Sequence, residues 1–108
     1  RVWSPGLEPH PGHEIAARQM HGGFGGIVSV QLAAGAEAAK HFVDHTQIFT
    51  LAESLGGVES LIEVPAAMTH ASVAGTTLQV PANLVRISVG IENADDLIAD
   101  LKQALDRI

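Results

Sequence analysis

One arginine stands inside the clearest apolar strand of the chain. Arg86 occupies the middle of Leu-Val-Arg-Ile-Ser-Val, residues 84–89, whose alternation and β-branched residues predict a strand. A charged side chain in an apolar strand is costly unless it is paired or faces a ligand. A guanidinium can hold a carboxylate through two parallel hydrogen bonds. Alternation also permits a solvent-facing Arg86, so spacing alone leaves carboxylate binding and simple exposure equally open.

A second polar group interrupts two other apolar stretches. Glu53-Ser54-Leu55-Gly56-Gly57 lies between residues 48–51 and 59–64, which we expect to form short strands. The paired glycines indicate a turn. Taken by themselves, these five residues are a turn with room for a functional role.

Six histidines raise the question of a metal site. His41 and His45 are four apart on a predicted helix, so they share a face and could chelate zinc. The glutamate of a zinc-protease helix is missing between them, and structural zinc needs four committed ligands. His10 and His13 lie in a proline-rich arm without a defined geometry. We therefore predict solvated surface histidines and no metal site.

Two further patterns do not predict a site. The glycine run at residues 22–26 precedes a predicted strand, whereas a phosphate-binding loop needs the order strand, glycines, helix. We interpret the run as a turn in which Phe24 serves as an anchor. Ser54 lacks the Gly-x-Ser-x-Gly context of a nucleophilic serine, so no hydrolytic triad is predicted.

Composition and charge exclude several classes of protein. The net charge is −6 and the six Lys and Arg residues are scattered, which argues against nucleic-acid binding. No segment approaches the roughly 20 apolar residues of a membrane helix, and the start lacks a signal-peptide pattern. The absence of cysteine fits a cytoplasmic protein. Because the first residue is Arg1, inside a turn sequence, we expect a segment of a longer protein.

The order of predicted elements indicates an α+β domain. We expect an extended linker arm at residues 1–12, and a domain at residues 13–108 with an antiparallel-rich sheet and helices packed on one face. Residues 66–83 show no regular pattern. The last helix is the best defined, because Asn93 can cap it and one apolar stripe runs along it. The expected elements are helix 13–20, strand 27–32, helix 36–44, strands 48–51, 59–64 and 84–89, and a final helix ending at Ile108.

Several separated motifs resemble one enzyme family. They are Leu-Ala-Glu-Ser-Leu-Gly-Gly-Val-Glu-Ser-Leu-Ile at residues 51–62, Met-Thr-His-Ala at 68–71 after Pro65, and Leu-Val-Arg-Ile-Ser-Val-Gly-Ile-Glu at 84–92. In this order they are similar to the C-terminal part of the pyridoxal-phosphate (PLP) enzymes of Cys/Met metabolism, which have fold type I. The resemblance runs from about residue 2 to residue 108, and Glu53 before Ser-Leu-Gly-Gly favours the cystathionine γ-synthase and γ-lyase branch.

The resemblance implies roles for five residues. Arg86 would bind the α-carboxylate of an amino-acid substrate, and backbone atoms around Leu55 would help to hold it. Ser54 would lie near the cofactor-bound lysine amine and orient it as it moves protons. Glu53 would face the distal end of the substrate, and Thr69 would line the pocket.

The resemblance also implies that essential parts lie outside this chain. The family lysine that forms the Schiff base stands in a Ser/Ala-Thr-Lys context, which does not occur here. Lys40 and Lys102 lie on predicted helices as solvated charges. The PLP domain, with the cofactor-binding residues and most contacts of a homotetramer, would be missing. We therefore expect PLP in the full-length enzyme and none bound to this chain.

Three functions follow as expectations. The first is the C-terminal part of a γ-replacement enzyme of methionine biosynthesis, which joins an O-acyl-homoserine to cysteine and is inactive without its PLP domain. The second is the matching part of a cystathionine γ-lyase. The third is a free-standing amino-acid-binding module that uses Arg86 as its carboxylate anchor.

Overall fold

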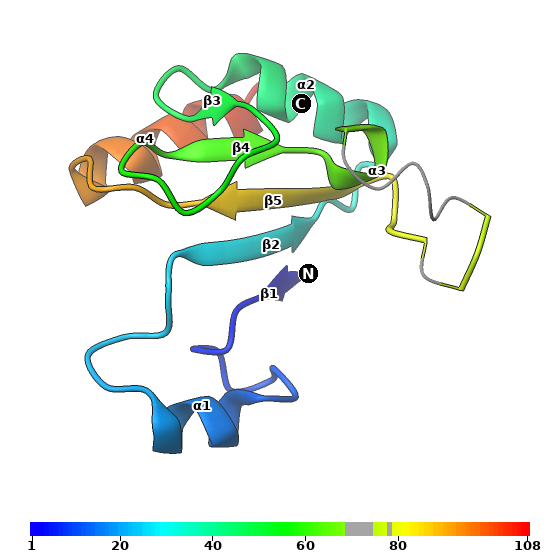
Figure 1. The fold of residues 1–108 in the computed structure, drawn as a ribbon. Coiled ribbons are helices and arrows are strands. Elements are labelled where there is room, and N and C mark those ends of the chain that lie inside the picture. The colour runs from blue at the N-terminus through cyan, green and yellow to red at the C-terminus, as the bar shows by residue number, and fades with distance from the viewer. Residues whose placement is uncertain (69–74, 78) are drawn as a thin grey trace.

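A mostly antiparallel sheet organises the protein. The computed structural model describes residues 1–68, 75–77 and 79–108, and within them five strands have the order β1-β2-β5-β4-β3 (Figure 1). Three pairings are antiparallel, and only β3 and β4 run parallel. The prediction of an antiparallel-rich sheet is therefore confirmed. The strands are β1 Val2–Trp3, β2 Ile27–Gln31, β3 Thr50–Leu51, β4 Leu61–Glu63 and β5 Leu84–Ser88.

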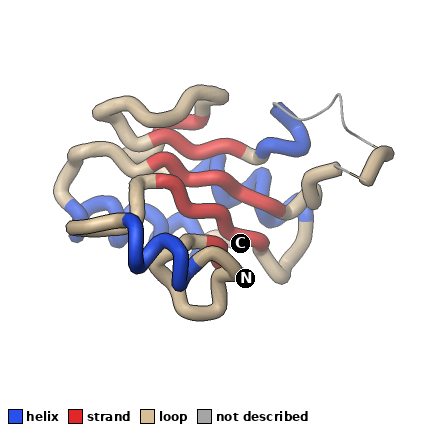
Figure 2. Tube along the Cα trace, turned by 60° about the horizontal axis from the view of Figure 1, so that its bottom comes forward, coloured by secondary structure: helices blue, strands red, loops and turns tan. Residues whose placement is uncertain are grey.

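Two long helices, α2 and α4, cover one face of this sheet and pack against each other (Figures 1 and 2). Helix α1 lies apart from them, beyond the β1 edge (Figure 1). The prediction that helices pack on one face holds for α2 and α4 but not for α1. The helices are α1 His13–Gln19, α2 Ala36–His45, α3 Pro65–Met68 and α4 Ala94–Leu105.

The core lies between the sheet and these two helices. Val85 and Ile87 of β5 are buried there, since alternate residues of a strand point to the same face. Phe42 of α2 and Leu97 of α4 meet them from the helix side. The cap predicted for α4 is present, because Oδ1 of Asn93 accepts hydrogen bonds from the backbone N–H groups of the first helical turn.

One buried carboxylate joins α4 to the segment that leads into β3. Asp100 is 5% exposed, and it accepts backbone hydrogen bonds from Gln47, Ile48 and Phe49 at 2.8, 2.8 and 3.1 Å. Burial by itself raises the pKa of Asp100, but these bonds and one from Gln103 outweigh it and hold the pKa below its ordinary value. The ionised form therefore fixes the start of β3 against the helix layer.

Three features of the N-terminal half and the middle differ from expectation. The arm at residues 1–12 was expected to be extended, yet within it turns close from Leu7 to Ser4 and from His10 to Leu7. Proline fixes φ at a value that suits turns as well as extended chain. Strand β1 and helix α3 were not predicted. Strand β1 is a pair of residues and α3 is a single helical turn, so neither leaves a periodic pattern in the sequence.

His21 and His41 are exposed, as predicted, whereas His10, His13 and His45 are only partly exposed and make local contacts. Nδ1 of His13 lies 2.8 Å from the carbonyl oxygen of Pro5, and its ring is 6.0 Å from that of Phe24. Nδ1 of His10 accepts a hydrogen bond from the backbone of Gly12, and Nδ1 of His45 contacts a carbonyl one helical turn earlier. These histidines therefore help to shape the chain locally, and Phe24 acts as the anchor that the glycine run indicated.

Two further observations concern the described part of the chain. None of its helices is both long enough and apolar enough to cross a membrane. None of its residues form a group of three or more His, Cys, Asp or Glu side chains that could hold a metal ion.

Candidate functional site

The sheet face opposite α2 and α4 carries an ion pair in its middle. Because Val85 and Ile87 point into the core, Arg86 and Ser88 point to this other face. The strand register places Arg86 between Ser29 of β2 and Glu63 of β4. A row of polar side chains therefore crosses the face, and we call this face the polar face of the sheet.

Arg86 is paired rather than free in solvent. Its Nη2 lies 2.8 Å from Oε1 of Glu63, and the two side chains are 19% and 1% exposed. The same Nη2 donates to the carbonyl oxygen of Glu53 at 3.2 Å. Nε and Nη1 make no hydrogen bond to any described residue. A guanidinium carries five N–H groups, so three of them remain for a ligand.

The loop at residues 52–60, which we call the Ser54 loop, is fixed to the polar face at several points. Gly56 donates its backbone N–H to Oγ of Ser88 at 2.8 Å, and Ser88 is 3% exposed. The carbonyl oxygen of Glu53 accepts from Arg86. The loop thus lies across Arg86 and Ser88, next to the ion pair.

A second group of hydrogen bonds fixes the far end of the Ser54 loop. The carboxylate of Glu92 accepts from the backbone N–H and Oγ of Ser60 at 2.9 and 2.7 Å. The backbone hydrogen bond from Ser60 is the largest cause of a lowered pKa at Glu92. Gly90 donates its N–H to Oγ of Ser60 at 2.8 Å, and Ile91 donates to the carbonyl oxygen of Val58 at 2.9 Å. The loop is thereby closed against the end of β5.

Gly90 is required at this junction for lack of space. A Cβ atom there would overlap the carbonyl oxygen of Val58 and would come within 2.7 Å of the backbone carbon of Glu59. Both neighbours are backbone atoms and cannot rotate away. The close approach of the two chain segments explains the glycine.

Three of the five predicted site residues lie in one loop beside a fourth. Glu53, Ser54 and Leu55 are exposed neighbours in the Ser54 loop, and Arg86 contacts the backbone of that loop. Arg86 meets the carbonyl group of Glu53. The fifth residue, Thr69, lies outside the described residues. The roles assigned to all five remain predictions.

Two residues of this site were not singled out from the sequence. Glu63 pairs with Arg86, and Ser88 holds the Ser54 loop. A signal for each was present, since Glu63 is the one charge in an apolar run and Ser88 is two residues from Arg86 on the same strand face.

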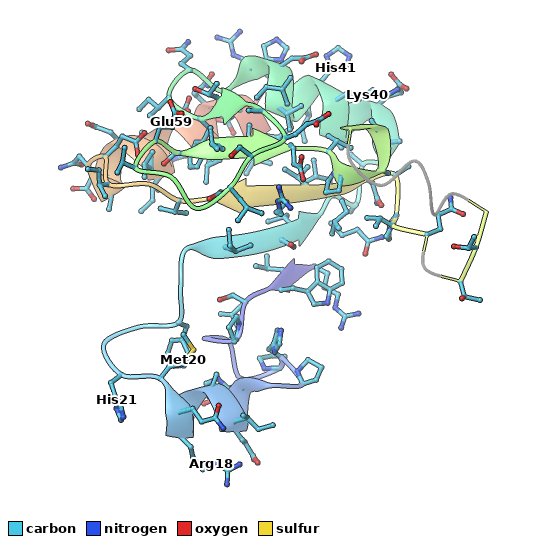
Figure 3. All side chains as sticks on the ribbon, viewed as in Figure 1. Arg18, Met20, His21, Lys40, His41 and Glu59 are labelled. Carbon is cyan, nitrogen blue, oxygen red and sulfur yellow. The ribbon has the colours of Figure 1, made fainter. Side chains whose placement is uncertain are left out.

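The lysines of this chain do not fit a covalently held PLP beside Arg86. Lys40 projects from the outer side of α2, 3.3 Å from Oε1 of Glu37 (Figure 3). Lys102 is exposed on α4. Both helices cover the sheet face opposite Arg86, so neither amine can approach the guanidinium.

Comparison with known proteins identifies the family. The model of the Cys/Met metabolism PLP-dependent enzymes matches residues 1–106. The chain belongs to this family. It is 65% identical over 105 residues to cystathionine gamma-synthase of Mycobacterium leprae, which covers 97% of the chain and 27% of that protein. It is 52% identical over 110 residues to cystathionine beta-lyase of Lactococcus lactis, covering 99% of the chain and 28% of the relative.

Solved structures of the family share this fold. The crystal structure of metB from Corynebacterium glutamicum matches with a TM-score of 0.94 and 60% identity, covering 99% of the chain and 28% of that structure. Cystathionine gamma synthase from Xanthomonas oryzae, solved in complex with cystathionine, matches with a TM-score of 0.84 and 50% identity. The match again covers 99% of the chain and 28% of that structure. The α+β fold is therefore that of the corresponding part of PLP enzymes. The chain spans little more than a quarter of the length of the relatives it matches.

Proposed function

We propose that this chain is the C-terminal, substrate-binding part of a cystathionine γ-synthase that joins an O-acyl-homoserine to cysteine. Residues 13–108 form the domain, and residues 1–12 link it to a PLP domain. The observation that carries the proposal is Arg86, held on the polar face by Glu63 beside the Ser54 loop. The high identity to γ-synthases along the whole chain supports the same reading.

In this proposal the chain's own residues recognise the substrate. Arg86 binds the α-carboxylate through N–H groups on Nε and Nη1, because Nη2 is already engaged by Glu63 and Glu53. The backbone around Leu55 adds hydrogen bonds to the same carboxylate. Glu53 faces the distal end of the substrate, where its charge favours an amino group. Thr69 lines the pocket.

Ser54 is proposed to act on the other half of the site. Its hydroxyl orients the lysine amine of the PLP domain, which is the group that moves protons during the reaction. PLP, when bound to the complete enzyme, withdraws electrons from the amino-acid carbons next to it. This chain alone is proposed to bind no PLP and to have no activity.

A cystathionine lyase is the alternative, since a γ-lyase of Dictyostelium discoideum is 50% identical and β-lyases of Lactococcus are 52% identical. The full-length protein with PLP separates these reactions. We expect cystathionine from cysteine with O-succinyl- or O-acetyl-homoserine. Release of 2-oxobutanoate from cystathionine as the faster reaction would instead identify a γ-lyase, and release of pyruvate a β-lyase.

A free-standing amino-acid-binding module is the third possibility. Calorimetry of this chain with homoserine, cysteine and cystathionine tests it. The γ-synthase proposal expects no heat of binding, because half of the pocket belongs to another domain. A dissociation constant below about 1 mM would favour the module. At about 1 mM the binding free energy is about −4 kcal/mol.

Assembly and location extend the proposal. The family resemblance supports a homotetramer, with most contacts made by the PLP domain, in the cytoplasm. Light scattering of the full-length protein tests the assembly, and a dimer or monomer at enzyme-assay concentrations would contradict it.

A further inference from the structure

Glu63 is a buried charge in the middle of the polar face. Its side chain is 1% exposed, compared with 5% for Asp100, the other buried carboxylate among the described residues. Burying a carboxylate removes a large hydration energy. Asp100 recovers it from backbone N–H groups and thereby joins two segments of the fold. Glu63 instead directs Oε1 at the guanidinium of Arg86.

The geometry of the pair fixes the orientation of Arg86. Glu63 and Arg86 are register partners on β4 and β5, so their backbones are held at a constant separation by the sheet. Arginine has a long side chain that loses much rotamer freedom when a ligand orders it. The 2.8 Å contact to Oε1 orders it before any ligand arrives. Ordering a binding group in advance lowers the cost of binding.

The same contact leaves a defined part of the guanidinium available. Glu63 and the carbonyl of Glu53 both engage Nη2. Nε and Nη1 donate no hydrogen bond to a described residue. The pair also lowers the net charge of the site, so recognition depends on the direction of the N–H groups more than on long-range attraction.

We infer that Glu63 is a positioning residue for substrate recognition, which holds the guanidinium of Arg86 in the orientation that receives a carboxylate. The inference rests on the proposed function of Arg86. It assigns Glu63 no contact with the substrate and an effect on recognition that acts through Arg86.

The test is a double-mutant cycle in the full-length holoenzyme, with O-succinyl- and O-acetyl-L-homoserine as the varied substrates and cysteine held constant. The variants are Glu63→Gln, Arg86→Ala and the two combined, with Glu37→Gln as the matched control. Glu37 is an exposed glutamate in the first turn of α2, in the helix layer that covers the opposite face of the sheet. Glutamine keeps the size and the acceptor oxygen of Glu63 while removing its charge.

We expect Glu63→Gln to raise KM about tenfold with kcat changed by less than about threefold, since ordering acts on binding. In the Arg86→Ala background the same substitution should leave KM unchanged. Glu37→Gln should behave as the parent enzyme. Two results would overturn the inference. One is that Glu63→Gln still raises KM when Arg86 is already replaced by Ala. The other is that Glu63→Gln leaves KM unchanged although Arg86→Ala raises it.

Failure of the proposed function gives a different result. If Arg86→Ala itself leaves KM for both acyl-homoserines unchanged, Arg86 does not bind the substrate and both proposals fall. If Glu63→Gln does not fold, Glu63→Asp replaces it, because aspartate keeps the charge but cannot reach Nη2 from the same backbone position. A raised KM for Glu63→Asp supports positioning, and an unchanged KM contradicts it.

Discussion

Replacing Asp100 by Asn should destabilise the protein more than the loss of any exposed carboxylate. Oδ1 of Asp100 accepts from Gln47 at 2.8 Å and from Gln103 at 3.1 Å, while Oδ2 accepts from Ile48 and Phe49 at 2.8 and 3.1 Å. An Asn side chain keeps one of these oxygens. At least one backbone N–H then faces an amide N–H instead of an acceptor. Each buried donor left without an acceptor costs about 1–3 kcal/mol, and bonds to a charged group are stronger still.

We therefore expect Asp100→Asn to lower the free energy of unfolding by about 2–4 kcal/mol at pH 7. Urea denaturation followed by circular dichroism measures it, and with a slope of about 1–3 kcal/mol per molar the midpoint falls by roughly 0.7–4 M. Asp95→Asn is the matched control, since Asp95 is exposed in the first turn of the same helix and contributes at most about 1 kcal/mol through the helix dipole.

The difference in unfolding free energy between the parent and Asp100→Asn should also depend on pH. The folded-state pKa of Asp100 lies below its ordinary value of 3.8. The ionised carboxylate therefore contributes its full stability above about pH 5 and loses it as the pH falls through the folded-state pKa. The gap between parent and Asp100→Asn should narrow below about pH 4. A gap under 1 kcal/mol at pH 7, or one that widens on acidification, would refute the reasoning.

Three further outcomes follow from the site. Ser88→Ala removes the acceptor of the Gly56 N–H, so kcat/KM of the full-length enzyme should fall while the free energy of unfolding drops by only about 1–3 kcal/mol. An unchanged kcat/KM would mean that Ser88 does not hold the loop. Gly90→Ala forces a Cβ into the backbone at Val58 and should cost about 1–3 kcal/mol or more in thermal unfolding, whereas a stability equal to the parent would contradict the packing described. Mixing this chain with PLP should give no adduct that borohydride traps, because neither lysine lies near Arg86. A trapped adduct on Lys40 or Lys102 would contradict this prediction.

Local signals predicted the elements that pack most firmly. Strand β5 alternates between core and polar face over its whole length, and its bounds were predicted within one residue. The N-cap and apolar stripe predicted α4 and its start, but the helix ends at Leu105 and not at Ile108 as predicted. Strand β1 is two residues long and exists only because β2 offers it an edge. Such a strand is set by its partner, and its own sequence carries too little pattern to reveal it.

The candidate site was predicted in part for the same reason. An arginine in an apolar strand marks itself as unusual, and the family motifs brought in Glu53 and Ser54. The partner of Arg86 could not be derived, because Glu63 meets it through the register of β4 and β5, which depends on how the strands pair in the folded protein. The anchoring of Gly56 by Ser88, 32 residues apart in sequence, depends on tertiary structure in the same way.

The role of Arg86 is tested most directly by comparing Arg86→Ala with the parent in the full-length holoenzyme. We expect kcat/KM for acyl-homoserine to fall by the equivalent of about 2–4 kcal/mol, the loss of a charge-assisted contact to a carboxylate. Arg86→Lys should recover only part of it, since an ammonium group lacks the planar fork. A kcat/KM within twofold of the parent in Arg86→Ala would contradict substrate binding by this residue.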